Sequence, residues 1–398
     1  MSERKKIFAI ISYPFLPATT GGEISTLQIL SFIGHQTDLK VFTVDPYKPV
    51  DPNSFSFDIE FGMRFKPTRY LNPFLLFGVL SKIKTQGADA IFFDQPFMGW
   101  MIPFLRLFTG KKVFIRSNNI EYLRFKSMGK SWWPLMRLYE KWVYRLANLV
   151  IFVSDVDQQK AIHGFGLNPN KTLLTPYGIP QKEVPALIPN AQQIIRQRHN
   201  LGSNQKILLF FATLSYQPNF EAVEFIADHI SPLLQKELGD NFCILICGKN
   251  LPEPLVQKVK ANPQLQYLGF VEDIETYIDG ADVMINPILS GGGVKTKAID
   301  TLGRGQTVIS TTTGAEGINP GVCGKNLQVA PDHNWPAFVG LITKHFGQDK
   351  PQIPDSFFEV YSWPGIVSKL LEKLNEHPIG IHEKTAELSN PISQKNSK

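Results

Sequence analysis

A run of three glycines followed by two lysines is the feature of this chain with the clearest chemical potential. Gly291, Gly292 and Gly293 follow a short apolar run, and Lys295 and Lys297 come directly after them, where a helix is expected to begin. Glycines expose backbone N–H groups to a ligand, and a helix start adds unpaired donors and partial positive charge. The pattern predicts a diphosphate site, without the spacing of a Walker A loop. A flexible loop with solvated lysines would carry the same residues.

An acid and a tight turn follow the glycine loop. Asp300 stands three residues beyond Lys297, where it could accept hydrogen bonds from a ribose diol. It could equally be a helix-surface acid paired with Lys297 or Arg304. After the next apolar run, Gly314 and Glu316 belong to a Gly-Ala-Glu-Gly turn that we expect beside the glycine loop.

Polar residues also follow apolar runs in the first half of the chain. Gly21 and Gly22 stand between the first run and a helix, so they are candidates for facing a ligand across a cleft. Asn118, Asn119 and Glu121 follow a later run, and residues at the carboxyl end of a strand can meet a substrate. The alternatives are a plain turn for the glycines and a helix cap for the second group.

The elements that must position these candidates alternate along the chain. Short apolar runs occur at 7–12, 39–44, 90–94, 112–116 and 149–154, and again at 206–212, 242–247, 265–268, 282–286 and 307–311. Stretches with helical periodicity separate them. This alternation predicts an α/β fold in which mostly parallel sheets are covered by helices on both faces. Two such doubly wound, Rossmann-like domains would face each other across a cleft, with the candidate loops at its sides.

The chain of 398 residues is too long for one ordinary core and suits two domains. The segment 181–202 is rich in Pro, Gln and Asn, which is typical of a linker. We therefore expect domains at 1–180 and 203–350. Residues 351–375 are expected to form a closing helical region, and 376–398, with few large apolar residues, a disordered tail.

Composition excludes several classes of protein. With 43% hydrophobic and 19% charged residues the chain is not wholly disordered, and it has no uninterrupted apolar run of the ~20 residues that a membrane span needs. Three cysteines without a CxxC pair favour a reduced, cytoplasmic protein. The apolar run after Lys5 and Lys6 is shorter than the roughly 7–15 residues of a signal-peptide core, so we interpret it as a buried strand.

Positive charge is concentrated in the first part of the chain. Residues 1–150 hold 20 Lys/Arg and 11 Asp/Glu, a balance of +9, whereas the whole chain is +6. Residues 111–145 hold nine Lys/Arg and two Asp/Glu together with Trp132 and Trp133, which suits an anionic membrane surface. Nucleic acid and a solvated basic face are the alternatives. In the helix that follows, we expect one apolar face to be core, comprising Leu135, Leu138, Tyr139, Trp142, Val143 and Leu146.

The block 207–318 resembles the C-terminal domain of retaining glycosyltransferases of the GT-B fold, family 4 (glycosyl transferases group 1). The matching motifs follow in order: Phe210-Phe-Ala-Thr-Leu-Ser-Tyr-Gln-Pro-Asn219, Ile244-Leu-Ile-Cys-Gly248, Tyr267-Leu-Gly-Phe-Val-Glu-Asp-Ile274, Asp282-Val-Met-Ile-Asn-Pro287, the glycine loop through Asp300, Gly305, and Gly314-Ala-Glu-Gly317. The first half is similar more loosely, through Gly21-Gly22, Ser117-Asn-Asn-Ile-Glu121 and 147–154. With Tyr361-Ser-Trp-Pro near the end, the resemblance covers nearly the whole chain.

The resemblance implies that the C-terminal domain binds a nucleotide-sugar donor and the N-terminal domain binds the acceptor. The donor's base would lie by Phe270 and Val271, its diphosphate and sugar at the glycine loop, and its ribose at Asp300. The further donor contacts would be Gly21, Gly22, Gly314 and Glu316. The acceptor-side residues would be Asn119 and Glu121, and the catalytic group Lys295, Lys297 and Asn118. No cofactor and no metal are expected.

The expected function is transfer of a sugar, with retention of configuration, to a lipid-linked, polysaccharide or other glycan acceptor in polysaccharide biosynthesis. The expected location is the cytoplasm, with peripheral attachment to the inner face of the plasma membrane through residues 111–145. Nucleic acid is not an expected partner. The alternative is a degenerate GT-B protein that binds a nucleotide sugar or glycan without turnover, because Asn118 stands where relatives often carry His and Asp300 has a shorter reach than the usual Glu.

Overall fold

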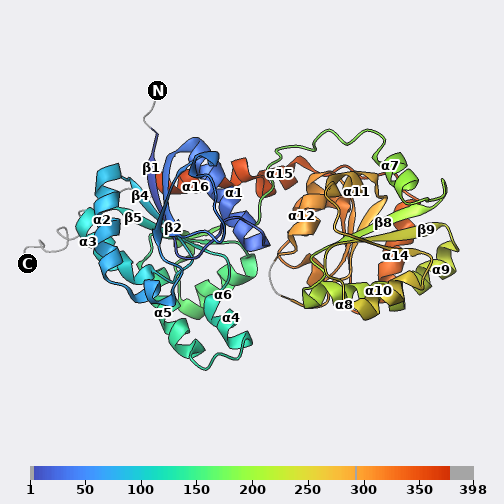
Figure 1. Cartoon of the computed structure of the whole chain (residues 1–398), viewed down its shortest axis with the longest axis horizontal. Coiled ribbons are helices and arrows are strands. Elements are labelled where there is room, and N and C mark those ends of the chain that lie inside the picture. Colours follow the sequence, from blue (N-terminus) through green and yellow to red (C-terminus); the bar gives the residue numbers. More distant parts are fainter. Residues whose placement is uncertain (1–3, 292–293, 377–398) are drawn as a thin grey trace, which may run out of the picture.

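The computed structural model describes residues 4–291 and 294–376, which form two α/β domains side by side (Figure 1). In this view α1 and α12 lie on the facing sides of the two domains. Gly292, Gly293 and residues 377–398 of the expected tail lie outside the described residues.

The first domain is built on a seven-stranded parallel sheet with the order β3-β2-β1-β4-β5-β6-β7. Its strands are β1 (Lys6–Ile11), β2 (Asp38–Val44), β3 (Asp58–Met63), β4 (Ala90–Asp94), β5 (Lys112–Ser117), β6 (Leu149–Phe152) and β7 (Thr172–Leu174). After Lys6, every residue of β1 is buried, as expected of a central strand between two helix layers. The strand order reverses between β1 and β4, and ligands bind at this point in such sheets.

Helices cover both faces of this sheet. They are α1 (Gly21–Gln36), α2 (Phe74–Gln86), α3 (Ile102–Thr109), α4 (Glu121–Ser127), α5 (Trp133–Leu146) and α6 (Asp155–Phe165). Along β1, Ile7 and Ala9 pack with α1, whereas Phe8 and Ile10 pack with α2, α3 and α5. The alternation follows from the two-residue period of a strand.

The second domain repeats this architecture with a six-stranded parallel sheet in the order β10-β9-β8-β11-β12-β13. Its strands are β8 (Lys206–Phe211), β9 (Phe242–Cys247), β10 (Leu265–Gly269), β11 (Val283–Asn286), β12 (Val308–Thr311) and β13 (Leu327–Ala330). Its helices are α8 (Gln217–Phe225), α9 (Ser231–Leu238), α10 (Glu253–Lys260), α11 (Ile274–Gly280), α12 (Thr296–Gly303), α13 (Pro320–Cys323) and α14 (Trp335–Phe346). The order reverses between β8 and β11, and the glycine loop follows β11.

The last helices join the two domains. α15 (Asp355–Tyr361) packs in the second domain against α12 and α13, and α16 (Trp363–Glu376) crosses back to pack on α1 of the first (Figure 1). Trp363 and Ile366 lie in the first domain's core, and Trp363 Nε1 donates to Gln28 Oε1 at 2.8 Å. The closing helices therefore hold the domains together.

The segment that we expected to be a linker, 181–202, is partly helical. It contains α7 (Ala191–Arg198), which packs on α11. Ile195 of α7 is fully buried in the second domain's core beside Ile207. The Pro-rich composition gave no sign of this helix.

The expectation that one apolar face of α5 is core was wrong for half of its residues. Leu135, Leu138 and Trp142 are 69%, 62% and 43% exposed. The helix packs into the first domain's core through Val143 and Tyr144, so only part of the expected face is buried. Periodicity locates an apolar stripe, but it does not show which element, if any, covers it.

Candidate active site between the two domains

A pocket of about 500 Å³ lies between the two domains. The first domain lines it with loops that follow β5 and β6, among them Asn118 and Asn119, and the second lines it with Tyr216, Val294 and Glu316. These loops lie at the carboxyl ends of parallel strands, where α/β folds bind ligands. Residues that are far apart in sequence thus meet in one pocket.

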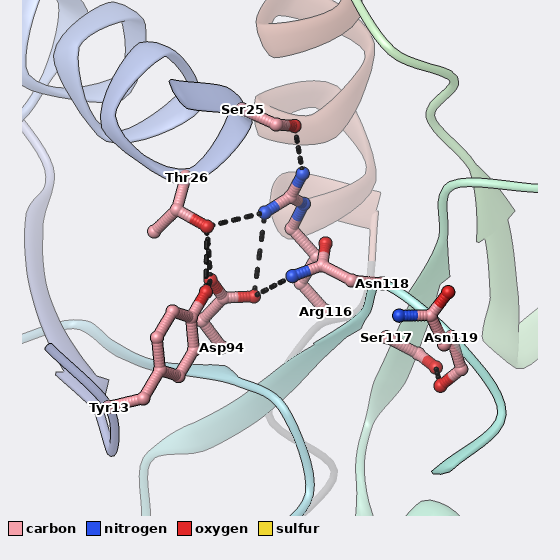
Figure 2. Close-up of polar contacts among 8 residues, drawn as sticks. All are labelled: Tyr13, Ser25, Thr26, Asp94, Arg116, Ser117, Asn118 and Asn119. Carbon is pink, nitrogen blue, oxygen red and sulfur yellow. Dashed lines mark hydrogen bonds and ion pairs between the residues drawn. The ribbon is translucent and has the colours of Figure 1, made fainter. Parts of the chain in front are cut away.

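A buried ion pair anchors the first domain's side of this pocket. Asp94 ends β4, its register partner on β5 is Arg116, and Arg116 Nη1 lies 3.5 Å from Asp94 Oδ1 with both side chains buried. Tyr13 and Thr26 donate to Asp94 Oδ2 at 2.5 and 2.8 Å, and Arg116 Nη2 donates to Ser25 Oγ at 2.5 Å. Figure 2 shows Tyr13, Thr26 and Arg116 converging on the Asp94 carboxylate, with Ser25 in contact with Arg116. The network ties the first turns of α1 to β4 and β5.

Asn118 is held by the same carboxylate. Its Nδ2 lies 3.4 Å from Asp94 Oδ1, and its side chain is half-buried in the pocket wall. With Nδ2 directed at Asp94, Oδ1 is the atom available to a ligand. Asn119 lies apart from Asp94 in Figure 2, is exposed, and accepts a hydrogen bond from Ser117 Oγ at its backbone carbonyl. Because an amide has no proton to lose at neutral pH and is not a base, Asn118 can orient a hydroxyl but cannot deprotonate it.

Glu121 belongs to a second cluster of buried polar residues, which includes Glu140. The buried Glu140 carboxylate accepts the backbone N–H groups of Glu121 and Tyr122 at 2.9 and 3.1 Å and so caps the start of α4. Burial raises the pKa of Glu140 to about 7. Glu121 is buried and pairs with Arg124 at 2.6 Å, and burial raises its pKa as well. It lines a cavity of the first domain rather than the interdomain pocket, whereas Asn119 lines both.

The glycine loop has a backbone that only glycine fits at its first position. Gly291 has φ 82°, and a Cβ there would lie 2.7 Å from Pro218 Cγ and 2.9 Å from the Tyr216 hydroxyl. Its carbonyl accepts a hydrogen bond from Lys295 Nζ at 2.8 Å. Burial lowers the pKa of Lys295, although the Glu316 carboxylate opposes the shift. α12 starts directly after Lys295, which confirms the expected order of strand, loop and helix.

Lys297 lies in the first turn of α12 and reaches the loop that follows β8. Its Nζ is 3.3 Å from Asn219 Oδ1 and 4.4 Å from the centroid of the Phe210 ring. Burial, together with the nearby Lys295 charge, lowers the pKa of Lys297 to about 7. An anion beside this amine would favour its charged form, so the site is suited to binding one.

Asp300 follows Lys297 by one helical turn and is half-buried. Burial raises its pKa to about 7. Arg304, one of the two partners expected for a surface acid, pairs instead with Asp279 at 2.5 Å and with Glu275 at 3.3 Å. A half-buried Asp300 does not fit an exposed helix-surface acid paired with Arg304, and its contact with a ribose stays a prediction.

Phe270 and Val271, the two residues expected beside the donor's nucleobase, differ in exposure. Phe270 is 60% exposed, and Lys249 Nζ lies 3.9 Å from the centroid of its ring. Val271 is half-buried against the second domain's core. The exposed ring offers a planar apolar surface of the kind on which aromatic ligands stack.

Gly314 shapes the turn that presents Glu316 to the pocket. A Cβ at Gly314 would lie 2.5 Å from Ser310 Oγ and 2.7 Å from the Asn286 carbonyl. Its carbonyl accepts a hydrogen bond from Asn286 Nδ2 at 2.9 Å. The buried Gly314 acts through packing, and Glu316 is the exposed member of the turn.

Gly21 and Gly22 are exposed at the start of α1. A Cβ on either would meet no atom within 4 Å, so neither glycine is required by packing.

In the part of the chain that the structure describes, no three His, Cys, Asp or Glu side chains are grouped so that they could hold a metal ion. Within the same residues, no helix is long and apolar enough to cross a bilayer.

Both halves of the chain match glycosyltransferase families. Residues 21–183 match the family described as Glycosyltransferase Family 4, and residues 205–345 match Glycosyl transferases group 1. Together with the two facing Rossmann-like domains, this decides the class. The chain is a GT-B glycosyltransferase. No curated protein matches it.

Solved structures share the fold of this glycosyltransferase at low identity. Anabaena HepE in complex with UDP superposes with a TM-score of 0.72 at 15% identity, covering 94% of this chain and 100% of HepE. A glycosyltransferase from Rickettsia africae gives 0.68 at 16% identity, with 94% and 98% covered. Sucrose-phosphate synthase from Thermosynechococcus elongatus gives 0.66 at 15% identity, with 94% and 99% covered.

Sequence reasoning missed several residues that shape the site of this glycosyltransferase. Asp94 ends β4 and Arg116 is the last residue but one of the neighbouring β5. A charged residue at the end of an apolar run was the available signal. Asn219 belongs to the motif after β8, but nothing in the sequence showed that it meets Lys297. Tyr216 and Val294 were named only as members of motifs, and both line the pocket.

Proposed function

We propose that this glycosyltransferase moves a sugar, with retention, from a nucleotide sugar to a glycan or lipid-linked acceptor. The observation that carries the proposal is the interdomain pocket, whose second-domain wall includes Val294 of the glycine loop. The adjoining residues Lys295 and Lys297 supply positive charge at the start of α12. Negative charge develops on the departing diphosphate, and fixed cations there stabilise the transition state.

Each part of the donor has a proposed contact. Lys295 and Lys297 hold the diphosphate, Asp300 accepts from the ribose, and the nucleobase lies against Phe270 and Val271. Because the two lysines supply the charge, we propose that no catalytic metal or other cofactor is needed. HepE was solved with UDP and with UDP-glucose, so UDP-sugars are the donors to test first.

The acceptor is proposed to enter from the first domain. Asn118 Oδ1 would accept a hydrogen bond from the reacting hydroxyl, with its amide oriented by Asp94. Asn118 need not act as a base if the departing diphosphate accepts the proton of the reacting hydroxyl. Asn119 and Glu121 would contact the remainder of the acceptor.

A thermal-shift screen of nucleoside diphosphates tests the donor site. A ligand that binds only the folded protein stabilises it by mass action and so raises its melting temperature. At a ligand concentration of a hundred times Kd, the free energy of unfolding increases by about 2.7 kcal/mol. We expect one diphosphate, and UDP first, to raise the melting temperature more than the corresponding nucleoside. If no diphosphate raises it, the proposed donor site is wrong.

Donor binding is expected to take up a proton at pH 8. The pKa of Lys297 without ligand is about 7, so at pH 8 most of the amine is neutral. A bound diphosphate favours the charged amine and raises its pKa, so binding draws a proton from the buffer and affinity falls as the pH rises above about 7. Calorimetry in two buffers of different ionisation enthalpy measures the uptake.

The control for this pH dependence is Lys297→Arg. Guanidinium stays charged at every pH used, so this variant should lose the proton uptake that Lys297 contributes while keeping a cation in place. Equal uptake in the wild type and the Arg variant would contradict the assignment of Lys297.

The first domain also carries an exposed apolar face that supports the membrane part of the proposal. α2 packs on α3, and α3 on α5. The exposed side chains of this face are Leu71, Phe74, Phe77, Phe104, Leu107, Phe108, Met128, Trp132, Leu135, Leu138 and Trp142. Exposed basic residues adjoin it, including Lys126, Lys130 and Arg145. Large exposed apolar patches often mark interaction sites, and we propose that this face rests on the anionic inner face of the plasma membrane.

Binding to anionic vesicles is expected to fall with added salt. Each Lys or Arg near such a surface contributes about 1 kcal/mol, screened over a Debye length of about 8 Å. Replacing Trp132 and Trp133 together by Ser should reduce the amount of protein that co-sediments with liposomes. The binding that remains should still depend on salt, because the basic residues are unchanged. Equal recovery with neutral and anionic vesicles would argue against an electrostatic surface.

A further inference from the structure

A second cavity, of about 920 Å³, lies within the first domain. Its wall is mainly apolar and aromatic, with Tyr70, Phe97, Trp100, Phe125, Met136 and Tyr139 among its lining residues. Trp100 Nε1 donates to the Tyr70 carbonyl at 2.7 Å, and the Tyr139 hydroxyl donates to the Phe97 carbonyl at 3.0 Å. The polar atoms of two aromatic residues in the wall are thereby satisfied by the backbone. The volume falls within the 300–1,000 Å³ of typical small-molecule sites.

One end of this cavity opens on the exposed apolar face. Leu71, Trp132 and Leu135 line the cavity and are 84%, 46% and 69% exposed. An apolar molecule on the apolar face could therefore enter the cavity past these apolar side chains.

The other end meets the interdomain pocket. Asn119 and Arg124 line both spaces. Gln95 also lines the cavity, has φ 75°, and its buried Oε1 has no hydrogen-bond partner among the described residues. A non-glycine residue in this conformation is uncommon and is often found at a functional site. The free amide oxygen would accept a hydrogen bond from a ligand hydroxyl.

Exposed basic residues lie near the cavity but outside its lining. Arg124 is paired with Glu121, so this pair adds no net charge at the junction. Lys126 and Lys130 are exposed in the segment before Trp132, and Lys126 Nζ lies 4.9 Å from the centroid of the Trp133 ring. The Trp132 ring packs against Phe125 at 4.3 Å. A molecule with a hydrocarbon chain and an anionic group thus matches both the wall and its surroundings.

We propose that this cavity holds the hydrocarbon chain of a lipid-linked acceptor that carries a phosphate. The chain would enter from the apolar face, and the sugar to be extended would lie in the interdomain pocket beside Asn119. The inference rests on the proposed function and narrows its acceptor to this class. A free polysaccharide would leave the apolar wall without a partner.

Dodecyl phosphate, kept below its micelle concentration, is the probe for this site. We expect calorimetry to detect its binding to the wild type, with dodecanol weaker and inorganic phosphate undetectable. Leu135→Glu places a charge at the mouth of the cavity and should weaken dodecyl phosphate binding by about tenfold or more, because the chain would have to pass a carboxylate.

Leu107→Glu is the matched control. Leu107 is 76% exposed on the same apolar face but does not line the cavity, so this variant should keep wild-type affinity for the probe. The melting-temperature shift with the nucleoside diphosphate shows that both variants are folded.

Equal losses in the Leu135 and Leu107 variants would mean that the probe only adsorbs to the apolar face, and would overturn the inference. So would equal affinities for dodecyl phosphate and inorganic phosphate. Diphosphate binding without dodecyl phosphate binding would overturn the lipid site and leave glycosyl transfer standing. Absence of diphosphate binding would overturn the proposed donor site itself, whatever the probe does.

Discussion

Replacing Lys297 by Ala is expected to weaken nucleoside diphosphate binding by about ten- to a hundredfold. A charge-assisted hydrogen bond contributes about 1.5–3 kcal/mol, and Lys297 Nζ lies buried at the start of α12 beside Asn219 and the Phe210 ring. Without a diphosphate, burial holds the pKa of this amine at about 7, so the ligand also restores its charge. Titration calorimetry at pH 7 measures the loss.

Lys258→Ala is the matched control for this prediction. It removes the same charge from an exposed pair with Asp228 on the second domain, at α10, and should leave diphosphate affinity unchanged. If the two variants bind the diphosphate equally well, Lys297 has no direct contact with it.

Replacing Arg116 by Met is expected to destabilise the first domain by about 3–5 kcal/mol, because it leaves the Asp94 carboxylate buried without its cation. Both side chains are almost fully buried. Four of the six tryptophans fall within residues 100–142, so fluorescence during denaturant unfolding follows mainly this domain. The double variant Arg116→Met with Asp94→Leu should lose less stability than the two single changes added together, since the pair acts as a unit.

The comparison is Arg198→Met, which breaks an exposed ion pair with Asp273. That pair is closer, at 2.6 Å, yet its side chains are 45% and 44% exposed. Exposed pairs contribute little because solvent screens them, so this change should matter far less than Arg116→Met. Equal effects of the two substitutions would show that burial does not govern the Asp94 network.

The fold and the glycine loop could be predicted from sequence because both depend on local patterns. Apolar runs mark strands, and Gly291 with the lysines at 295 and 297 marks a loop that enters a helix. The observed α12 begins at Thr296. The positive φ of Gly291 and the close approach of Pro218 then explain why glycine stands there.

The Asp94 network could not be predicted, because it depends on strand register. Asp94 and Arg116 are 22 residues apart and become neighbours only when β4 pairs with β5. Tyr13, which follows β1, and Thr26 of α1 also reach Asp94 only in the folded chain. Local sequence contains the residue types but not the distances between them.

The exposed face of α5 was misread for a different reason. A stripe that includes Leu135 and Leu138 fits a core-facing helix, and sequence carries no record of what covers it. In the fold Val143 is the fully buried member of that stripe, and Tyr144 packs beside it in the core. Leu135 of that stripe lines the apolar cavity instead.

The most direct test of the account is release of nucleoside diphosphate from a nucleotide sugar, followed by NMR of the sugar product. The wild type is incubated with the donor whose diphosphate gave the largest thermal shift, with a bacterial lipid extract supplying acceptors. We predict that diphosphate is released, that the new anomeric linkage keeps the donor's configuration, and that Lys297→Ala releases far less. Diphosphate binding with no release under any of these conditions would contradict the account and leave a GT-B protein that binds its ligand without turnover.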